Sequence, residues 1–328
     1  MKTRTLLYLD PADARGGIEI YAERQAAALM EAGAEAVVTH QVPADFSEWD
    51  EVFVHKCSDA ATLERFPPEK TTLYVHDHDQ ICPRSYAYTP LRRNCRRASG
   101  LWPCMLCAPL CRDWRGALAR VAWQSRRKRA MAKMRRLVVL SRFMKTRLVE
   151  NGIPADRIVV EPPRISAAPA GPGGAGGQSR TDQCARADDS SEPVDMLFVG
   201  QLIRGKGVQL LLRAMALMER PRTLDVVGAG NMRHALEKLS VRLGLGGRVR
   251  FRGFDPDPRE WMRRAACVVV PSFWQEPYGL VAAEATALGR PVVAFAIGGL
   301  PEACGSDAVL VPPGDVSALA RALDAQGV

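Results

Sequence analysis

Two glutamates near the C-terminus lie at a spacing that could bring two carboxylates to one ligand. Glu276 and Glu284 are separated by seven residues in the segment FWQEPYGLVAAEATALGRPVVAF, where a Pro-Tyr-Gly turn opens a helical pattern. At 3.6 residues per turn, Glu276 lies in the loop and Glu284 about one and a half turns into the helix. The two carboxylates would then face one ligand from two heights and could accept hydrogen bonds from sugar hydroxyl groups.

The start of this helix has the properties of an anion site. The backbone N–H groups of Gly279, Leu280 and Val281 have no partner within the helix and lie at the positive end of its dipole. Such a helix start suits a diphosphate. A carboxylate beside this site would repel phosphate but could accept hydrogen bonds from sugar hydroxyls; the alternative for each glutamate is a solvated surface or capping residue.

Two series of apolar runs must position these residues. The first half alternates short apolar runs with helical patterns; the runs are 5–9, 36–40, 51–55, 71–76, 137–141 and 157–162, and the helices are 18–33 and about 117–135. A second series contains runs 196–200, 223–228, 248–253, 266–272, 291–296 and 308–313, with helices between them. This alternation predicts two α/β, Rossmann-like domains that face each other across a cleft. Ligands of such sheets bind beyond the carboxyl ends of the strands.

The domain boundaries follow from composition. Residues 166–193 consist largely of Pro, Gly, Ala, Ser and charged residues with almost no large apolar side chains, which predicts a flexible linker or long loop. The N-terminal domain is therefore predicted at 1–165, with a Cys-rich loop at 80–115, and the C-terminal domain at 194–328.

The segment EPYGLVAAEATALGRPVVAFAIGGLPE resembles the Glu-x7-Glu region of group 1 (family 4) retaining glycosyltransferases, which have the two-domain GT-B fold. FVGQLIRGKGVQLLLRA, DVVGAGNMRHALEKLSVRLGL, RGGIEIYAERQAAALMEAG and VVLSRFMKTRLVENGIPADRIVVEPP resemble further segments of that family. The resemblance implies a sugar transfer in which the acceptor hydroxyl attacks from the face that the diphosphate leaves.

The same resemblance implies roles for single residues. Glu284 would bind the ribose hydroxyls, and Glu276 would contact the donor sugar with help from the backbone of Tyr278, Gly279 and Leu280. Lys206 would neutralise the departing diphosphate, and His76 would lie near the transferred sugar. Gly16 and Gly17 would let the first loop approach the donor phosphate or the acceptor closely, because they carry no side chain. Catalysis by positioning and charge stabilisation requires no metal.

The sequence departs from the family pattern at two places. Gln201 stands where the family usually has an arginine after the glycine of the phosphate segment, and Arg204 is expected to substitute for it in donor binding. The sequence also ends at ARALDAQGV, soon after the last apolar run, where the family commonly continues through further helices. We therefore expect a truncated C-terminal domain, or one that relies on a partner.

Charge and cysteines are concentrated in the N-terminal half. Eighteen Lys and Arg residues between Arg84 and Arg147 stand against one acid, Asp113, in a chain whose net charge is +9. The basic segment 115–147 predicts an anionic partner, and a membrane surface is favoured over nucleic acid because the aromatics are not interleaved as stacking platforms. The alternative is a solvated helix face. No run of about 18 apolar residues or signal sequence is present, which predicts a cytoplasmic protein, with peripheral attachment to the inner membrane face.

Five cysteines crowd one region of the N-terminal half, and only two of them form a tight Cys-x2-Cys pair. A structural zinc site on these thiols is one interpretation, and reduced thiols in an acceptor loop are the other. The five are Cys82, Cys95, Cys104, Cys107 and Cys111.

The sequence thus predicts a hexosyltransferase-like retaining glycosyltransferase. The donor would be a UDP- or GDP-type nucleotide sugar and the acceptor a glycan or lipid-linked sugar, in cell-surface polysaccharide or glycoconjugate biosynthesis. The alternatives are a non-catalytic nucleotide-sugar-binding scaffold and a sugar epimerase or phosphorylase on the same fold.

Overall fold

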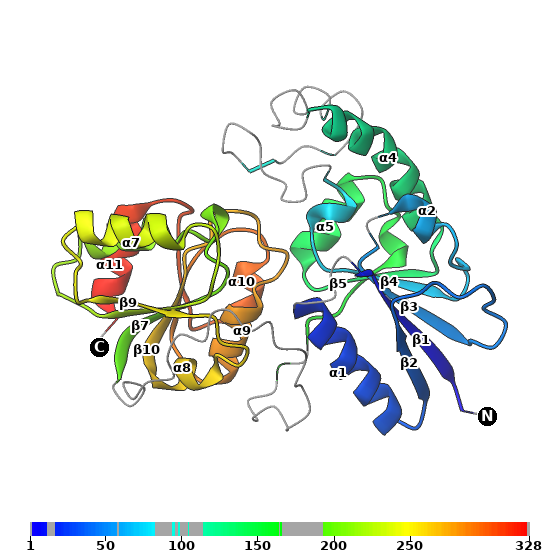
Figure 1. Cartoon of the computed structure of the whole chain (residues 1–328), viewed down its shortest axis with the longest axis horizontal. Helices are drawn as coiled ribbons and strands as arrows, with labels where there is room; N and C mark the ends of the chain where they lie inside the picture. Colours follow the sequence, from blue (N-terminus) through cyan, green and yellow to red (C-terminus); the bar gives the residue numbers. More distant parts are fainter. Residues whose placement is uncertain are drawn as a thin grey trace. The chain divides into compact units, whose positions relative to one another are not determined.

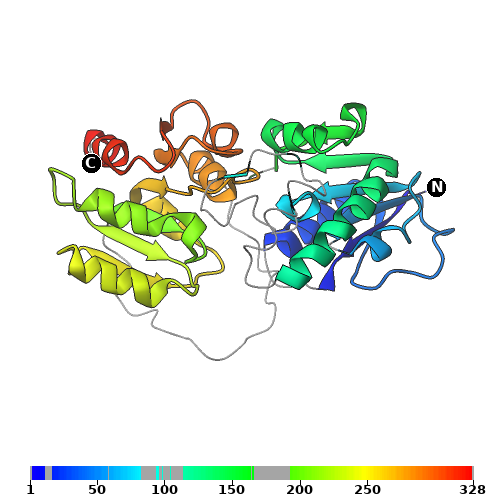
Figure 2. The same cartoon turned by 90° about the horizontal axis from the view of Figure 1, so that it is seen from above.

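The computed structural model describes residues 2–11, 17–57, 59–82, 94–95, 98, 104, 114–163, 165 and 193–326. The chain divides into two compact units, residues 1–162 and 163–328. Each unit contains a six-stranded, fully parallel sheet with helices on both faces (Figures 1 and 2). The described residues contain no helix long and apolar enough to cross a bilayer.

The N-terminal unit orders its strands β2-β1-β3-β4-β5-β6. The strands are β1 (Arg4–Leu9), β2 (Glu35–Thr39), β3 (Glu51–His55), β4 (Thr71–Val75), β5 (Arg136–Val139) and β6 (Ile158–Val160). The helices are α1 (Gly17–Glu31), α2 (Ala60–Leu63), α4 (Trp114–Lys133) and α5 (Arg142–Glu150), with 3-10 turns η2 (His78–Gln80) and η4 (Ala155–Arg157).

Side chains that alternate along the strands of this unit pack into two apolar layers, one on each face of the sheet. On β3, Val52 and Val54 point into a layer with side chains from α2, α4 and α5. Phe53 points to the opposite layer, where Ala26 and Leu29 of α1 cover the sheet. Because side chains alternate along a strand, His55 lies on the same face as Phe53, beneath α1.

The C-terminal unit orders its strands β12-β11-β10-β7-β8-β9. The strands are β7 (Val194–Val199), β8 (Leu224–Val227), β9 (Val249–Gly253), β10 (Ala265–Val270), β11 (Val292–Phe295) and β12 (Val309–Val311). The helices are α6 (Val208–Met215), α7 (Arg233–Arg242), α8 (Arg259–Arg264), α9 (Leu280–Ala287), α10 (Leu300–Ala303) and α11 (Val316–Ala325), with the 3-10 turn η5 (Arg204–Lys206). Buried leucines of α6, α7 and α11 form the core of one face, and α8 and α9 contact the strands from the other.

Strand order brings the loops of each sheet together. The strands β7, β10 and β11 are neighbours, so the segments that follow them meet at one edge. The strands β3 and β4 are neighbours in the other sheet, which places the residues after them side by side. Both edges are carboxyl ends of parallel strands, where ligands of open α/β sheets bind.

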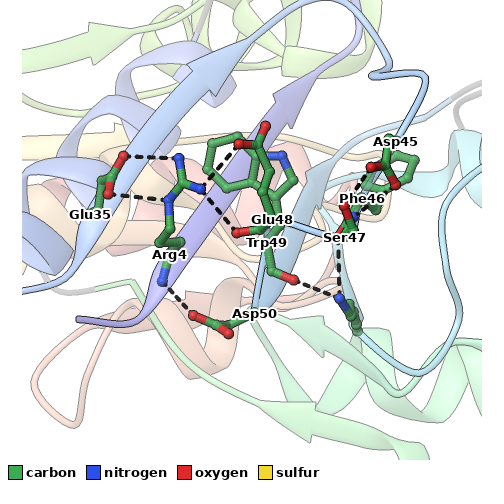
Figure 3. Close-up of polar contacts among 9 residues, drawn as sticks. Arg4, Glu35, Asp45, Phe46, Ser47, Glu48, Trp49 and Asp50 are labelled. Atoms are coloured by element: carbon green, nitrogen blue, oxygen red, sulfur yellow. Dashed lines mark hydrogen bonds and ion pairs between the residues drawn. The ribbon is translucent and has the colours of Figure 1, made fainter. Parts of the chain in front are cut away.

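The amino ends of the N-terminal sheet are tied by a polar network around Arg4, at the start of β1 (Figure 3). The Arg4 guanidinium donates from Nε to Glu35, at 3.2 Å, and from Nη1 to Glu48, at 3.1 Å. The guanidinium also lies 5.0 Å from the ring centre of Trp49, and the backbone N–H of Arg4 donates to Asp50. This network fixes the connection into β3 at the edge opposite to the one that carries His55.

Candidate active site

Glu276 is the centre of a polar cluster at the carboxyl edge of the C-terminal sheet. Its side chain is only 8% exposed. The Lys206 ammonium donates to Oε1 at 2.6 Å, the Ser272 hydroxyl at 2.7 Å and the Trp274 indole N–H at 2.8 Å. All three hydrogen bonds end on the same oxygen. Among the described residues none donates to Oε2, so that oxygen is left for a ligand.

The cluster keeps this buried carboxyl ionised. Burial raises the pKa of Glu276. The Lys206 charge and the hydrogen bonds from Lys206, Ser272 and Trp274 together lower it by more than burial raises it, so the pKa lies below its usual value. Lys206 is a quarter exposed, and its ammonium also lies 5.2 Å from the ring centre of Trp274. An ammonium carries three N–H donors, so Lys206 can bind Glu276 and still donate to a second anion.

Close backbone approaches hold the loops of this cluster. Gly207 has φ +78°, and a Cβ at this position would lie 1.8 Å from the carbonyl oxygen of Pro271. Gly298 has φ +62°, and a Cβ there would lie 2.4 Å from the carbonyl oxygen of Glu276. The Gly299 N–H donates to that same carbonyl at 2.7 Å. The loops after β7, β10 and β11 therefore fit together only with glycine at these positions.

Helix α9 begins beside this cluster. Gly279 precedes its first residue, and no side chain caps the helix start. Leu280 is exposed, Val281 is partly exposed and Tyr278 is buried. The first N–H groups of α9 can therefore bind an anion. Glu284 lies partly buried one turn further along. Asp257 raises the pKa of Arg259 through its hydrogen bond and charge, and the charge of Glu284 makes a smaller contribution in the same direction.

The residues of the glycine-rich segment after β7 divide into two groups. Lys206 joins Glu276, as described above. Gln201 and Arg204 are exposed at the same end of the sheet, with Arg204 in the turn η5. Within the described part of the chain, neither side chain forms a hydrogen bond or ion pair with the Glu276 cluster.

A second polar cluster lies in the N-terminal unit. His76 follows β4, is partly buried, and its Nε2 lies 3.1 Å from Nδ1 of His55. Burial, with a smaller contribution from the Lys56 charge, lowers the pKa of His76 to about 3. Lys56 itself forms ion pairs with Asp77, at 3.0 Å, and Asp79, at 3.3 Å. Of the two predicted loop glycines, Gly17 is the first residue of α1 and Gly16 lies outside the described residues.

The cysteine prediction falls partly outside the described residues. Cys82, Cys95 and Cys104 are partly buried, whereas Cys107 and Cys111 are not among the residues described. Within the described part of the chain, no group of three or more His, Cys, Asp or Glu side chains could hold a metal. The structural zinc site therefore stays a prediction.

The basic segment has an exposed face on α4, but acids from elsewhere in the unit pair with part of its charge. Trp123 is 47% exposed, and Arg129 is exposed on the same helix. Arg126 pairs with Glu64, and the charges of Arg135 and Arg136 pair with Glu51 and Glu161. The free positive charge of the segment is therefore smaller than its sequence suggests.

Comparison with known proteins finds similarity to glycosyltransferases in the C-terminal unit. Residues 193–325 match the family described as Glycosyl transferases group 1. This unit resembles a group 1 glycosyltransferase domain. An uncharacterized glycosyltransferase of Methanocaldococcus jannaschii is 43% identical over 111 residues, which are 33% of this chain and 28% of that protein. The D-inositol 3-phosphate glycosyltransferase of Streptomyces coelicolor is 38% identical over 165 residues, 45% of this chain and 35% of that protein. The aligned regions thus span about a third of these relatives.

Solved glycosyltransferase structures share the fold of the whole chain. A glycosyltransferase from Rickettsia africae has a TM-score of 0.69 at 18% identity, covering 99% of this chain and 88% of that one. Anabaena HepE in complex with UDP-glucose has a TM-score of 0.63 at 19% identity, covering 98% and 88%. The predicted fold class, two Rossmann-like domains of the GT-B type, is confirmed.

The sequence did not predict several site residues of the group 1 glycosyltransferase-like unit, or His55 of the N-terminal unit. Ser272 and Trp274 precede Glu276 by four and two residues in PSFWQE. This closeness of a hydroxyl and an indole to the carboxylate could have predicted that they donate to it. Gly298 and Gly299 lie in the AIGGLPE segment, but their contact with residues 275–278 depends on strand order. His55 carried no signal beyond its place at a strand end.

Proposed function

We propose that this chain is a retaining, hexosyltransferase-like glycosyltransferase that uses a nucleotide-sugar donor. The observation that carries the proposal is the Glu276 carboxylate, which is buried and ionised and receives three hydrogen bonds on Oε1. The free Oε2 would accept a hydrogen bond from a hydroxyl of the donor sugar. The similarity of residues 193–325 to group 1 glycosyltransferases supports this assignment.

In this proposal, the donor diphosphate lies between Lys206 and the start of α9. The two N–H donors that Lys206 does not use for Glu276, the exposed Arg204 and Gln201 side chains and the first amides of α9 would bind its oxygens. Charge that develops on the departing diphosphate would be stabilised there by groups already in place, and removal of one such donor typically slows a reaction about 100- to 1,000-fold. Glu284 would bind the ribose hydroxyls.

The donor base is proposed to be of the UDP or GDP type, and the acceptor to be a glycan or a lipid-linked sugar in cell-surface polysaccharide or glycoconjugate synthesis. HepE was solved with UDP-glucose bound, which supports a UDP-sugar as the first donor to test. Under the same proposal, His76 would donate a hydrogen bond to the transferred sugar, and catalysis would use no metal.

We also propose that α4 places the enzyme on an anionic membrane surface at the cytoplasmic side. Trp123 is exposed on this helix, with Arg129 and Lys133 exposed further along. Tryptophan is enriched at membrane interfaces, and each lysine or arginine near an anionic surface contributes about 1 kcal/mol. Such attachment would bring the enzyme close to a lipid-linked acceptor.

The test combines donor binding with product analysis. Thermal unfolding of the full chain is measured with UDP-, GDP-, ADP- and TDP-sugars, because a ligand at 100 times its Kd adds about 2.7 kcal/mol of stability. One selective donor should raise Tm, and Glu284→Ala should remove the rise. With that donor, Glu276→Gln should abolish sugar transfer to lipid-linked acceptors. Donor binding without transfer to any acceptor would instead support a non-catalytic scaffold, and a changed sugar without an acceptor would support an epimerase.

A further inference from the structure

The two histidines that end neighbouring strands form a hydrogen-bonded pair in the N-terminal unit. His55 is the last residue of β3 and His76 follows β4, and these strands pair in parallel with His55 opposite Tyr74. Nδ1 of His55 lies 3.1 Å from Nε2 of His76. One of these nitrogens must carry the hydrogen that joins them, because a ring nitrogen donates only when it is protonated.

Aromatic packing fixes the orientation of both rings. His55 is fully buried and stacks on Tyr74, with ring centres 4.5 Å apart and planes inclined by 13°. Tyr21 of α1 packs its ring at 74° against His76, with centres 5.2 Å apart. The hydroxyl of Tyr74 accepts a hydrogen bond from Gln25 of α1 at 2.5 Å. These contacts hold the hydrogen-bonded edges of the two imidazoles toward each other.

Both imidazoles are neutral at physiological pH. Burial, and then the neighbouring His76, lower the pKa of His55 well below its usual value. The pKa of His76 is lowered to about 3 by burial and by the charge of Lys56, which Asp77 and Asp79 balance with their ion pairs. Two neutral rings leave two arrangements, in which either His55 or His76 donates the shared hydrogen.

The far nitrogen of His55 distinguishes these arrangements. Its Nε2 is buried and has no hydrogen-bond partner among the residues that the structure describes. If His76 donated, His55 would carry its own hydrogen on Nε2, and that N–H would be an orphaned buried donor. If His55 donates from Nδ1, its Nε2 is an unprotonated lone pair. Orphaned buried N–H groups are rarer in proteins than acceptors short of a donor, so the second arrangement is favoured.

We propose that His55 is a positioning residue that holds His76 in the Nδ1–H tautomer, so that His76 presents an N–H donor to a ligand oxygen. The described residues offer no hydrogen-bond partner to Nδ1 of His76, and the residue as a whole is only partly buried. Neutral histidine in water prefers the Nε2–H tautomer, so His76 needs this contact to remain a donor on its exposed side. The identity of the ligand as the transferred sugar rests on the proposed function, whereas the tautomer does not.

Nitrogen NMR of the full chain tests the tautomer directly. The chain has five histidines, so the imidazole signals of 15N-histidine-labelled protein at pH 7 can be assigned with single substitutions. We expect a protonated Nδ1 and an unprotonated Nε2 on both His55 and His76. In His55→Phe, which keeps a flat ring beside Tyr74, His76 should shift toward the Nε2–H form. A wild-type His76 protonated on Nε2 overturns the proposal, whatever the result for His55→Phe.

The matched control is Tyr74→Phe, which removes the hydroxyl bound by Gln25 and keeps the ring stacked on His55. This variant should leave the His76 signals unchanged, and a shift as large as that in His55→Phe would make the effect one of packing and overturn the proposal. With an active donor, His55→Phe should slow transfer about 2- to 12-fold, the loss of one ordinary hydrogen bond. If the tautomer is as stated and no sugar is transferred, the proposed function fails while this inference stands.

Discussion

Replacement of Lys206 by methionine removes the cation from the Glu276 carboxylate and keeps an unbranched apolar side chain at this position. Loss of one partner from a fully buried ion pair costs about 3–5 kcal/mol. Lys206 is 25% exposed, and Ser272 and Trp274 still donate to Oε1, so water and the remaining bonds offset part of that cost. We expect Lys206→Met to lower the free energy of unfolding by about 2–3 kcal/mol at pH 7.

The pH dependence of this loss follows from the Glu276 pKa. In the wild type this pKa lies below 4.5, the ordinary value, so ionised Glu276 contributes stability above that value and loses it as pH falls through the folded-state pKa. Without Lys206, burial dominates and the folded-state pKa rises. The two proteins should approach equal stability as pH falls toward 4 and below.

Urea unfolding followed by circular dichroism measures these differences. Arg204→Met removes a positive charge from the same turn at an exposed position and should change stability by less than about 0.5 kcal/mol. In a Glu276→Gln background, Lys206→Met should cost less than about 1 kcal/mol, which gives the coupling between the two side chains. A cost below 0.5 kcal/mol in the wild-type background, or one that is the same at pH 7 and pH 4, would refute the reasoning.

Three further predictions test other parts of the structure. Gly207→Ala should lower the free energy of unfolding by about 2–5 kcal/mol, measured by thermal unfolding, because its Cβ would meet the Pro271 carbonyl. Gly244→Ala, with a similar positive φ and open space, should lower it by only about 1–2 kcal/mol. Equal losses would contradict the close approach at Gly207. The folded pKa values of His55 and His76 are lowered from 6.5, so stability should fall as pH drops below 6.5, and His55→Phe should flatten this fall in urea unfolding. Trp123→Ala should weaken sedimentation with anionic vesicles roughly tenfold; retained binding would exclude α4 as the contact.

Apolar runs predicted the strands well because strand burial is a local property. Each of the twelve runs in the sequence corresponds to a strand in the described residues, within a few residues at either end. Most runs are rich in valine and leucine, as strands buried on both faces by helices require. The run at 248–253 instead alternates arginine with apolar residues, and it forms the edge strand β9. Helix α1 was likewise expected at 18–33 and spans Gly17–Glu31.

The candidate site was predicted only where its chemistry was local in sequence. Glu276 and the α9 start belong to one segment, so residue spacing was enough to place them together. The bond between Lys206 and Glu276 joins residues 70 positions apart and depends on β7 and β10 being neighbours. No spacing rule gives strand order, so the lysine was assigned to the diphosphate and its pairing with the glutamate was not foreseen.

Under the proposed function, the main-chain contacts around Glu276 limit how donor specificity could be exchanged between this chain and similar glycosyltransferases. Gly205 accepts a hydrogen bond from the Phe273 N–H, and Gly299 donates one to the Glu276 carbonyl, so three loops share one backbone framework. A chimera that imports only the loop at 271–279 would bring new side chains onto a framework shaped for other neighbours. Recombination should therefore move the segments after β7, β10 and β11 as a single block, with crossover points inside the strands.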